Sequence, residues 1–349
     1  MSTPLDSPVA VLRRIAFLME RQREESRRIE AFRRAAAVLL PLEPDEVVER
    51  ARSGTLTELA GIGPSTSAVV TDVVAGRVPE RLAALEETAG PLVPGGRALR
   101  AALRGDLHSH SNWSDGGSPI EEMAFTALEL GHEYLVLTDH SPRLRVANGL
   151  SAERLGRQLD VVDAVNTHLA GGGFRLLKGI EVDILDDGSL DQDPALLDRL
   201  EVRVASVHSK LRMDAAPMTR RMLVAVANPH TNVLGHCTGR LVTGNRGTRP
   251  TSQFDARAVF EACVEHDVAV EINSRPERRD PPTKLLELAR DTGCLFSIDS
   301  DAHAPGQLDM LDHGCERAEE AGIDPDRIVN TWPVERLLAW ANPDRAQLR

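Results

Sequence analysis

The chain has 349 residues, 42% of them hydrophobic, and a formal net charge of −12 at pH 7. This composition supports a sizeable core and excludes a wholly disordered chain, and no apolar run reaches the ~18 residues that a transmembrane helix needs. Four widely spaced cysteines, none of them in a CxxC pair, are typical of reduced thiols, so we expect a cytoplasmic protein with no disulfide framework and no membrane partner.

The negative charge is confined to the second part of the chain. Residues 1–100 hold 14 arginines, no lysine and 14 acidic residues, so residues 101–349 carry the entire −12. A uniformly acidic protein would be a poor ligand for polyanions, but the first segment here is neutral. The eleven histidines all lie at or after His108, which places any imidazole chemistry in the acidic part.

Residues 1–90 are predicted to form a small all-α domain. Apolar side chains recur at helical spacing over residues 9–19 and 29–39, and residues 45–51 make a short third helix. The Gly-Ile-Gly segment at 61–63 permits a tight turn, and Pro64 suits the first position of the next helix. Because free N–H groups at a helix start can hold a phosphate, Gly61, Gly63 and Ser65 are candidate contacts to a DNA backbone.

Residues 8–95 resemble the N-terminal 8-kDa helix-hairpin-helix domain of bacterial family X DNA polymerases. The matching stretches are residues 28–35, 54–59, 61–63 and 74–79. The resemblance implies sequence-independent contact with a DNA backbone. The lysine usual near the second glycine is replaced by Ser65 and Thr66, and no lysine precedes Lys178, so Schiff-base lyase chemistry is not expected. The alternative is a helical domain that packs on its neighbour and binds nothing.

Residues 91–102 are expected to be a linker, followed over residues 103–349 by short apolar runs that alternate with helical stretches. The seven runs are residues 103–110, 134–137, 175–180, 202–207, 233–235, 268–272 and 295–298. Continuous apolar runs are typical of buried parallel strands, and the intervening helices suit right-handed crossovers. We therefore predict the α/β class, with a distorted seven-stranded (β/α)7 barrel whose polar strand ends share one rim.

The candidate metal ligands lie at or just after these strand ends. Residues i and i+2 of a strand point the same way, so His108 and His110 face one place, as do Asp301 and His303. The six histidines and three carboxylates of the set are His108, His110, Asp115, His140, Glu181, His208, His236, Asp301 and His303. These side chains are ligand types of zinc, manganese and iron, and their number predicts two or three divalent ions.

Other polar residues are candidates for supporting roles. Lys210, Arg240 and Arg275 follow strand ends, where they are candidate clamps for a substrate phosphate or, alternatively, surface salt bridges. Asp139 and His230 are candidates for holding a liganding imidazole from behind.

Residues 104–340 resemble a PHP domain, the polymerase and histidinol phosphatase family, and most closely the PHP domains of bacterial family X polymerases. The matching motifs are His-x-His at 108–110, Ser-Asp-Gly at 114–116, Thr-Asp-His at 138–140, Gly-x-Glu at 179–181, Ser-Val-His at 206–208, Gly-His-x-Thr-Gly-Arg at 235–240 and Ser-Asp-Ala-His at 300–303. The resemblance implies that all nine ligand positions of the family are filled.

The resemblance also implies a metal-dependent phosphoesterase that uses a metal-activated water. We expect its substrate to be a small phosphomonoester such as histidinol phosphate or a DNA 3′ end, so the enzyme is a phosphatase or a 3′-5′ exonuclease. In family X polymerases a palm and thumb separate the two domains, whereas only about twenty residues lie between Thr88 and His108, so no polymerase activity is expected.

Two other functions stay open. One is a non-catalytic, DNA-associated regulatory protein with a structural metal cluster. The other is an amidohydrolase-type metallohydrolase, whose barrel also begins with His-x-His. That barrel typically has a bridging modified lysine at a mid-barrel strand end, where this chain has Glu181, with Lys178 inside the strand.

Overall fold

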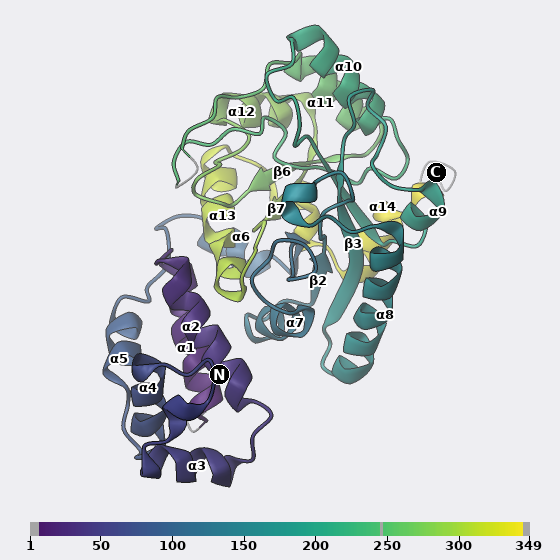
Figure 1. The fold of residues 1–349 in the computed structure, drawn as a ribbon. Coiled ribbons are helices and arrows are strands. Elements are labelled where there is room, and N and C mark those ends of the chain that lie inside the picture. The colour runs from purple at the N-terminus through teal and green to yellow at the C-terminus, as the bar shows by residue number, and fades with distance from the viewer. Residues whose placement is uncertain (1–6, 245–246, 345–349) are drawn as a thin grey trace. The chain divides into compact units, whose positions relative to one another are not determined.

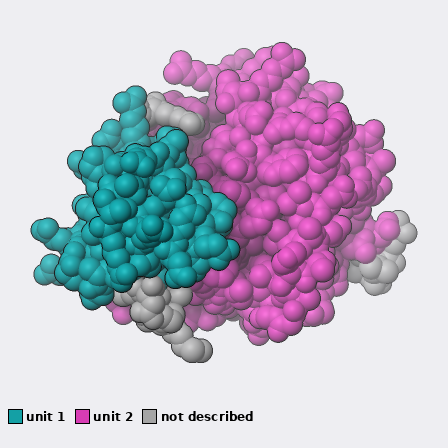
Figure 2. All heavy atoms as spheres, turned by 60° about the horizontal axis from the view of Figure 1, so that its bottom comes forward, with its two compact units in different colours: residues 1–91 teal, residues 92–349 magenta. Residues whose placement is uncertain are grey.

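A computed structural model describes residues 7–244 and 247–344, and the chain divides into two compact units, residues 1–91 and 92–349 (Figure 2). Each unit has its own apolar core. Among the described helices, none is both long and apolar enough to cross a bilayer.

The first unit is helical, as predicted. Its helices are α1 (Pro8–Arg21), α2 (Ser26–Leu39), α3 (Pro44–Ser53), α4 (Pro64–Val74) and α5 (Glu80–Glu87) (Figure 1). Apolar side chains at helical spacing fill the core, including Leu12, Ile15, Phe32, Leu56, Val70 and Leu82. Two arginines are paired with glutamates, Arg33 with Glu20 at 2.6 Å and Arg81 with Glu24 at 2.5 Å, so part of the positive charge of this unit is neutralised internally.

The glycine turn before α4 is an exposed helix start. Gly61 has φ of +105°, and a Cβ there would lie 3.0 Å from the Arg34 side chain, so this turn requires glycine. Gly63 caps α4, and its N–H donates to the Thr66 hydroxyl at 3.0 Å. Ser65 is exposed in the first turn. These three candidate DNA contacts are thus neighbours, and their role stays a prediction.

The second unit is a nearly closed barrel of seven parallel strands in sequential order, which confirms the predicted fold class. The strands are β1 (Gly105–Ser109), β2 (Tyr134–Leu137), β3 (Arg175–Asp183), β4 (Val202–Ser206), β5 (Val233–Leu234), β6 (Ala269–Asn273) and β7 (Leu295–Asp299). The helices outside it are α7 (Ile120–Glu129), α8 (Ala152–Leu169), α9 (Pro194–Leu197), α10 (Ala215–Val226), α11 (Ala256–Glu265), α12 (Thr283–Thr292) and α13 (Leu311–Glu320), with α14 (Val334–Ala341) after them (Figure 1).

Side chains join the first and last strands of the barrel. One bridge links Ser109 to Ala302 next to this seam. The buried Asp106 carboxylate accepts a hydrogen bond from the Ser300 N–H at 3.2 Å and another from the Ser300 hydroxyl. The Asn330 amide donates to backbone carbonyls of both strands, at 3.2 and 2.9 Å. These bonds hold β1 beside β7 and bring both ends of the barrel sequence to one place.

The segment expected to be a linker is partly helical. Residues 97–102 form α6 (Arg97–Ala102), and Leu99 on it is buried in the barrel core. Gly96 adopts φ of +72°, and its N–H donates to Glu319 of α13 at 2.7 Å. The structure therefore corrects the linker boundary, because close packing against α13 makes residues 96–102 part of the barrel unit.

Candidate metal centre

The nine predicted ligands converge at the carboxyl ends of the barrel strands. His108 and Glu181 lie near the ends of β1 and β3, and the other seven follow strands: His110, Asp115, His140, His208, His236, Asp301 and His303. Parallel strands end on one rim, which is why His110 after the first strand and Asp301 after the last strand come together.

Glu181 is at the centre of the cluster. Its Oε2 lies 3.3 Å from His108 Nε2 and 2.9 Å from His140 Nδ1. Its Oε1 lies 3.2 Å from His208 Nε2 and 2.9 Å from His236 Nε2. The two oxygens thus face two different sets of imidazoles, which is the arrangement expected of a carboxylate that bridges neighbouring ions.

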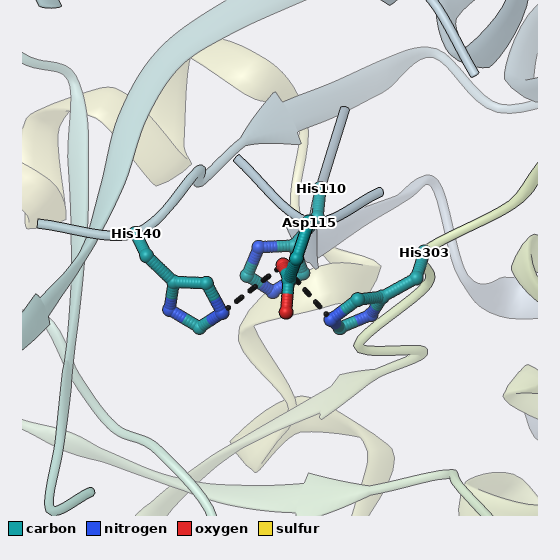
Figure 3. Close-up of side chains that lie close together, drawn as sticks. All are labelled: His110, Asp115, His140 and His303. Carbon is teal, nitrogen blue, oxygen red and sulfur yellow. Dashed lines mark ion pairs between the residues drawn. The ribbon is translucent and has the colours of Figure 1, made fainter. Parts of the chain in front are cut away.

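A second group of donors surrounds Asp115. Its Oδ1 lies 3.4 Å from His140 Nε2 and 3.4 Å from His303 Nε2, and these two pairs are dashed in Figure 3. His110 completes the group, whose four ligand atoms lie within 4.8 Å of one another. His110 also joins a third group with Asp301, since its Nε2 lies 3.5 Å from the Asp301 carboxylate.

The donor set fits divalent transition metals. Both ring nitrogens of His110 and Nδ1 of His236 are buried with no hydrogen-bond partner among the described residues. Burying an unpaired polar atom is costly, and a metal ion is one partner that would satisfy such nitrogens. Imidazole and carboxylate donors without thiolates suit zinc, manganese or iron. The overlap of the three donor groups is compatible with more than one ion.

The charges of the cluster keep its carboxylates ionised. Burial alone would raise the pKa of Glu181, but the charges of His208, His108 and His140 hold that pKa well below its usual range. Burial would lower the pKa of His140, and the neighbouring Glu181 and Asp115 carboxylates instead raise it to about 10. Ionised carboxylates are the form that binds cations.

Two arginines border the cluster. Arg275 Nη1 lies 3.0 Å from His303 Nδ1, which places this predicted phosphate clamp beside the ligands. Arg278 Nε lies 3.0 Å from Asp301 Oδ2, and sequence reasoning missed this residue. Its position five residues after β6 was the available signal, because the loops after barrel strands build the site.

The other two predicted clamps have partners elsewhere. The Lys210 side chain is 63% exposed, and its ammonium pairs with Asp186 at 2.5 Å. The Arg240 guanidinium donates to the carbonyl oxygens of Arg278, at 3.0 Å from Nε, and of Arg279. Within the described residues, these bonds tie Arg240 to the loop after β6.

The roles predicted for Asp139 and His230 need correction. The Asp139 carboxylate accepts hydrogen bonds from Ser111, Ser114 and Gln158 rather than from a liganding imidazole. These bonds anchor the loop that carries Asp115. Adjacent side chains of an extended chain point apart, so Asp139 faces away from the neighbouring ligand His140. His230 precedes β5, at the opposite end of the strand from the cluster, and pairs with Asp198 at 2.8 Å.

Lys178 is also away from the cluster. Its ammonium pairs with Asp163 of α8 at 2.7 Å, whereas Glu181 of the same strand faces the imidazoles. This placement does not favour the bridging modified lysine of an amidohydrolase-type site.

The barrel unit is similar in sequence to known proteins. Residues 106–275 match the family model "PHP domain". The chain is 37% identical over 238 residues to the DNA polymerase/3′-5′ exonuclease PolX of Bacillus subtilis (strain 168), an alignment that covers 68% of this chain and 41% of that protein. The chain thus spans less than half the length of this relative.

Two further proteins are similar over most of their own length. A probable phosphatase of Thermoanaerobacter sp. (strain X514) is 27% identical, with 65% of this chain and 89% of that protein covered. The solved histidinol phosphate phosphatase from Lactococcus lactis, complexed with zinc, L-histidinol and phosphate, is 16% identical with a TM-score of 0.47, and the match covers 63% of this chain and 94% of that one.

Proposed function

We propose that this chain, whose residues 106–275 match the family model "PHP domain", is a metal-dependent phosphoesterase of that family. The observation that carries the proposal is the convergence of nine imidazole and carboxylate side chains on the barrel rim. Divalent ions bound there supply Lewis acidity toward phosphate oxygens and lower the pKa of a water molecule.

One side of the cluster is accessible, which favours catalysis over a structural metal site. The side chains of Asp115 and His303 are 28% and 21% exposed, whereas that of Glu181 is 1% exposed. A structural site is closed by its ligands, but a catalytic site keeps a position that substrate can reach. Substrate therefore approaches from the side of Asp115 and His303.

The arginines beside the cluster suit the charge of a phosphate ester. Arg275 and Arg278 contact His303 and Asp301, next to the accessible side. A guanidinium binds phosphate oxygens in a planar, two-point geometry, so either arginine can hold and orient the reacting group once a substrate competes with the carboxylate.

The substrate is proposed to be either a small phosphomonoester, such as histidinol phosphate, or a DNA 3′ end. The names of the relatives include both a phosphatase and a 3′-5′ exonuclease, which supports keeping the two classes. A DNA substrate gives the helical unit a role, because the exposed start of α4 with Gly61, Gly63 and Ser65 suits a backbone phosphate.

The test is hydrolysis with defined metal content. The protein, as purified and after loading with Mn²⁺ or Zn²⁺, is assayed on p-nitrophenyl phosphate, histidinol phosphate and 3′-recessed DNA. We expect release of phosphate or nucleotide from at least one of them. The double variant His108→Ala/His110→Ala is expected to lose metal and activity together, whereas His168→Ala, an exposed histidine on α8, keeps both. No release from any substrate by the metal-loaded protein would refute the proposal.

A further inference from the structure

Strand β6 contributes no residue to the nine predicted ligands, yet two of its side chains lie within the cluster. Glu271 and Asn273 are two positions apart and point to the same side of the strand. Both are buried, with 0% and 1% exposure. A carboxylate buried in a central strand is costly unless its oxygens are fully bonded, so its contacts identify what it does.

The Glu271 carboxylate connects two predicted ligands. Its Oε1 lies 2.6 Å from His108 Nδ1, and its Oε2 accepts the backbone N–H of His236 at 2.5 Å. With a carboxylate oxygen as the acceptor, Nδ1 of His108 is the donor of this hydrogen bond. A metal ion binds only the neutral ring, whose unprotonated nitrogen is then Nε2, on the side of Glu181 at 3.3 Å.

Asn273 extends this connection to the last strand. Its Nδ2 lies 3.2 Å from Glu271 Oε2 and 3.1 Å from Asp301 Oδ2. Its Oδ1 accepts the backbone N–H of Arg275 at 3.1 Å, which fixes the orientation of the amide. The pair thus bonds to side chains or backbone from β1, from the loop after β5 and from the loop after β7.

We propose that Glu271 is a positioning residue that fixes Nε2 of His108 as its metal-ligating atom, and that Glu271 and Asn273 together set the spacing of His108, His236 and Asp301. The inference rests on the proposed metal centre. Partners behind a ligating imidazole fix its tautomer and orientation, and their loss typically weakens metal binding about 10- to 100-fold.

The decisive variant is Glu271→Gln, because glutamine has the same length but only one acceptor oxygen. It can serve His108 or His236, but not both. We expect Zn²⁺ affinity, measured by competition with a chelator, to fall about 10- to 100-fold. Two-bond ¹H–¹⁵N spectra of the imidazoles in the metal-free protein, recorded at a pH where His108 is neutral, should show His108 protonated at Nδ1 in the wild type and a mixture of tautomers in the variant.

The matched control is Glu20→Gln, the same change at a buried carboxylate in the core of the helical unit, which pairs with Arg33 at 2.6 Å. It should keep wild-type Zn²⁺ affinity. If Glu271→Gln fails to fold by circular dichroism, Asn273→Ser decides, since it leaves the contact of Glu271 with His108 intact and should weaken Zn²⁺ binding about tenfold.

Unchanged Zn²⁺ affinity and an unchanged His108 tautomer in Glu271→Gln would overturn the inference, as would wild-type affinity in Asn273→Ser when the first variant does not fold. Neither measurement needs turnover. A wild-type protein that hydrolyses no phosphate ester would therefore refute the proposed function and leave this inference to be decided by the metal and tautomer data.

Discussion

Replacing Glu181 with glutamine is the strongest single test of the metal centre. The side chain keeps its volume but loses the charge that faces five imidazoles, all of which place a ring nitrogen within 3.5 Å of the carboxylate. The residue is only 1% exposed, so water cannot replace the lost interaction.

The expected loss follows from the burial of this charge. Removing one partner of a buried charge pair costs about 3–5 kcal/mol. Because about 1.4 kcal/mol corresponds to a factor of ten in affinity, Glu181→Gln should weaken binding of a divalent ion by roughly two to four orders of magnitude. Hydrolysis of p-nitrophenyl phosphate should fall in parallel at limiting metal concentration.

The measurement is metal stoichiometry after gel filtration, together with affinity from chelator competition. Glu133→Gln is the control, since that glutamate is 45% exposed and pairs with Arg104 on the surface. It should bind metal like the wild type. If Glu181→Gln retained wild-type stoichiometry with an affinity within about threefold, Glu181 would not be a ligand and the reasoning from its central position would be wrong.

Three further predictions concern stability and DNA. Burial, with a smaller contribution from Arg100, lowers the pKa of His132 to about 3. The neutral folded form therefore loses stability as pH falls below 6.5, by about 2 kcal/mol between pH 8 and 5. Urea unfolding should show this loss of stability in the wild type, and His132→Leu should lack it. Gly96→Ala should destabilise the barrel by about 2 kcal/mol or more, because φ is +72° and the new Cβ would clash with the backbone nitrogen of Glu316. An unchanged urea midpoint would contradict this. Ser65→Glu should weaken retention of 3′-recessed DNA about fivefold or more in filter binding. Ser53→Glu, which adds the same charge on α3, should retain DNA like the wild type. Equal retention by the two variants would refute the contact at the start of α4.

The sequence was sufficient to predict the strands and the convergence of the ligands, because both follow from local patterns. His108 and His110 are two positions apart at the end of one strand, and His140, His208 and His236 each follow an apolar run typical of a buried strand. Parallel strands share one rim, so their convergence required no knowledge of distances.

The residues behind the ligands could not be found in this way. Glu271 lies inside a strand rather than at its end, and its partners His108 and His236 are 163 and 35 positions away. A charged residue within an apolar strand was a signal that it must be paired, but nothing in the sequence names the partner. The prediction for Asp139 was wrong because it relied on closeness in sequence. Asp139 and His140 are adjacent in the chain, but the Asp139 carboxylate bonds to Ser111 and the His140 ring faces Glu181.

The seam between β1 and β7 has a consequence for the order of events during folding. The cluster takes His108 and His110 from the first strand and Asp301 and His303 from beyond the last, and Asp106 and Ser300, which join these strands, are 194 positions apart. Contacts of such long range form late, after the loop-closure entropy has been overcome. A complete set of donors therefore exists only in a chain that has finished closing its barrel. Tight metal binding would then stabilise the native state selectively, because no partly folded intermediate offers the complete set of ligands.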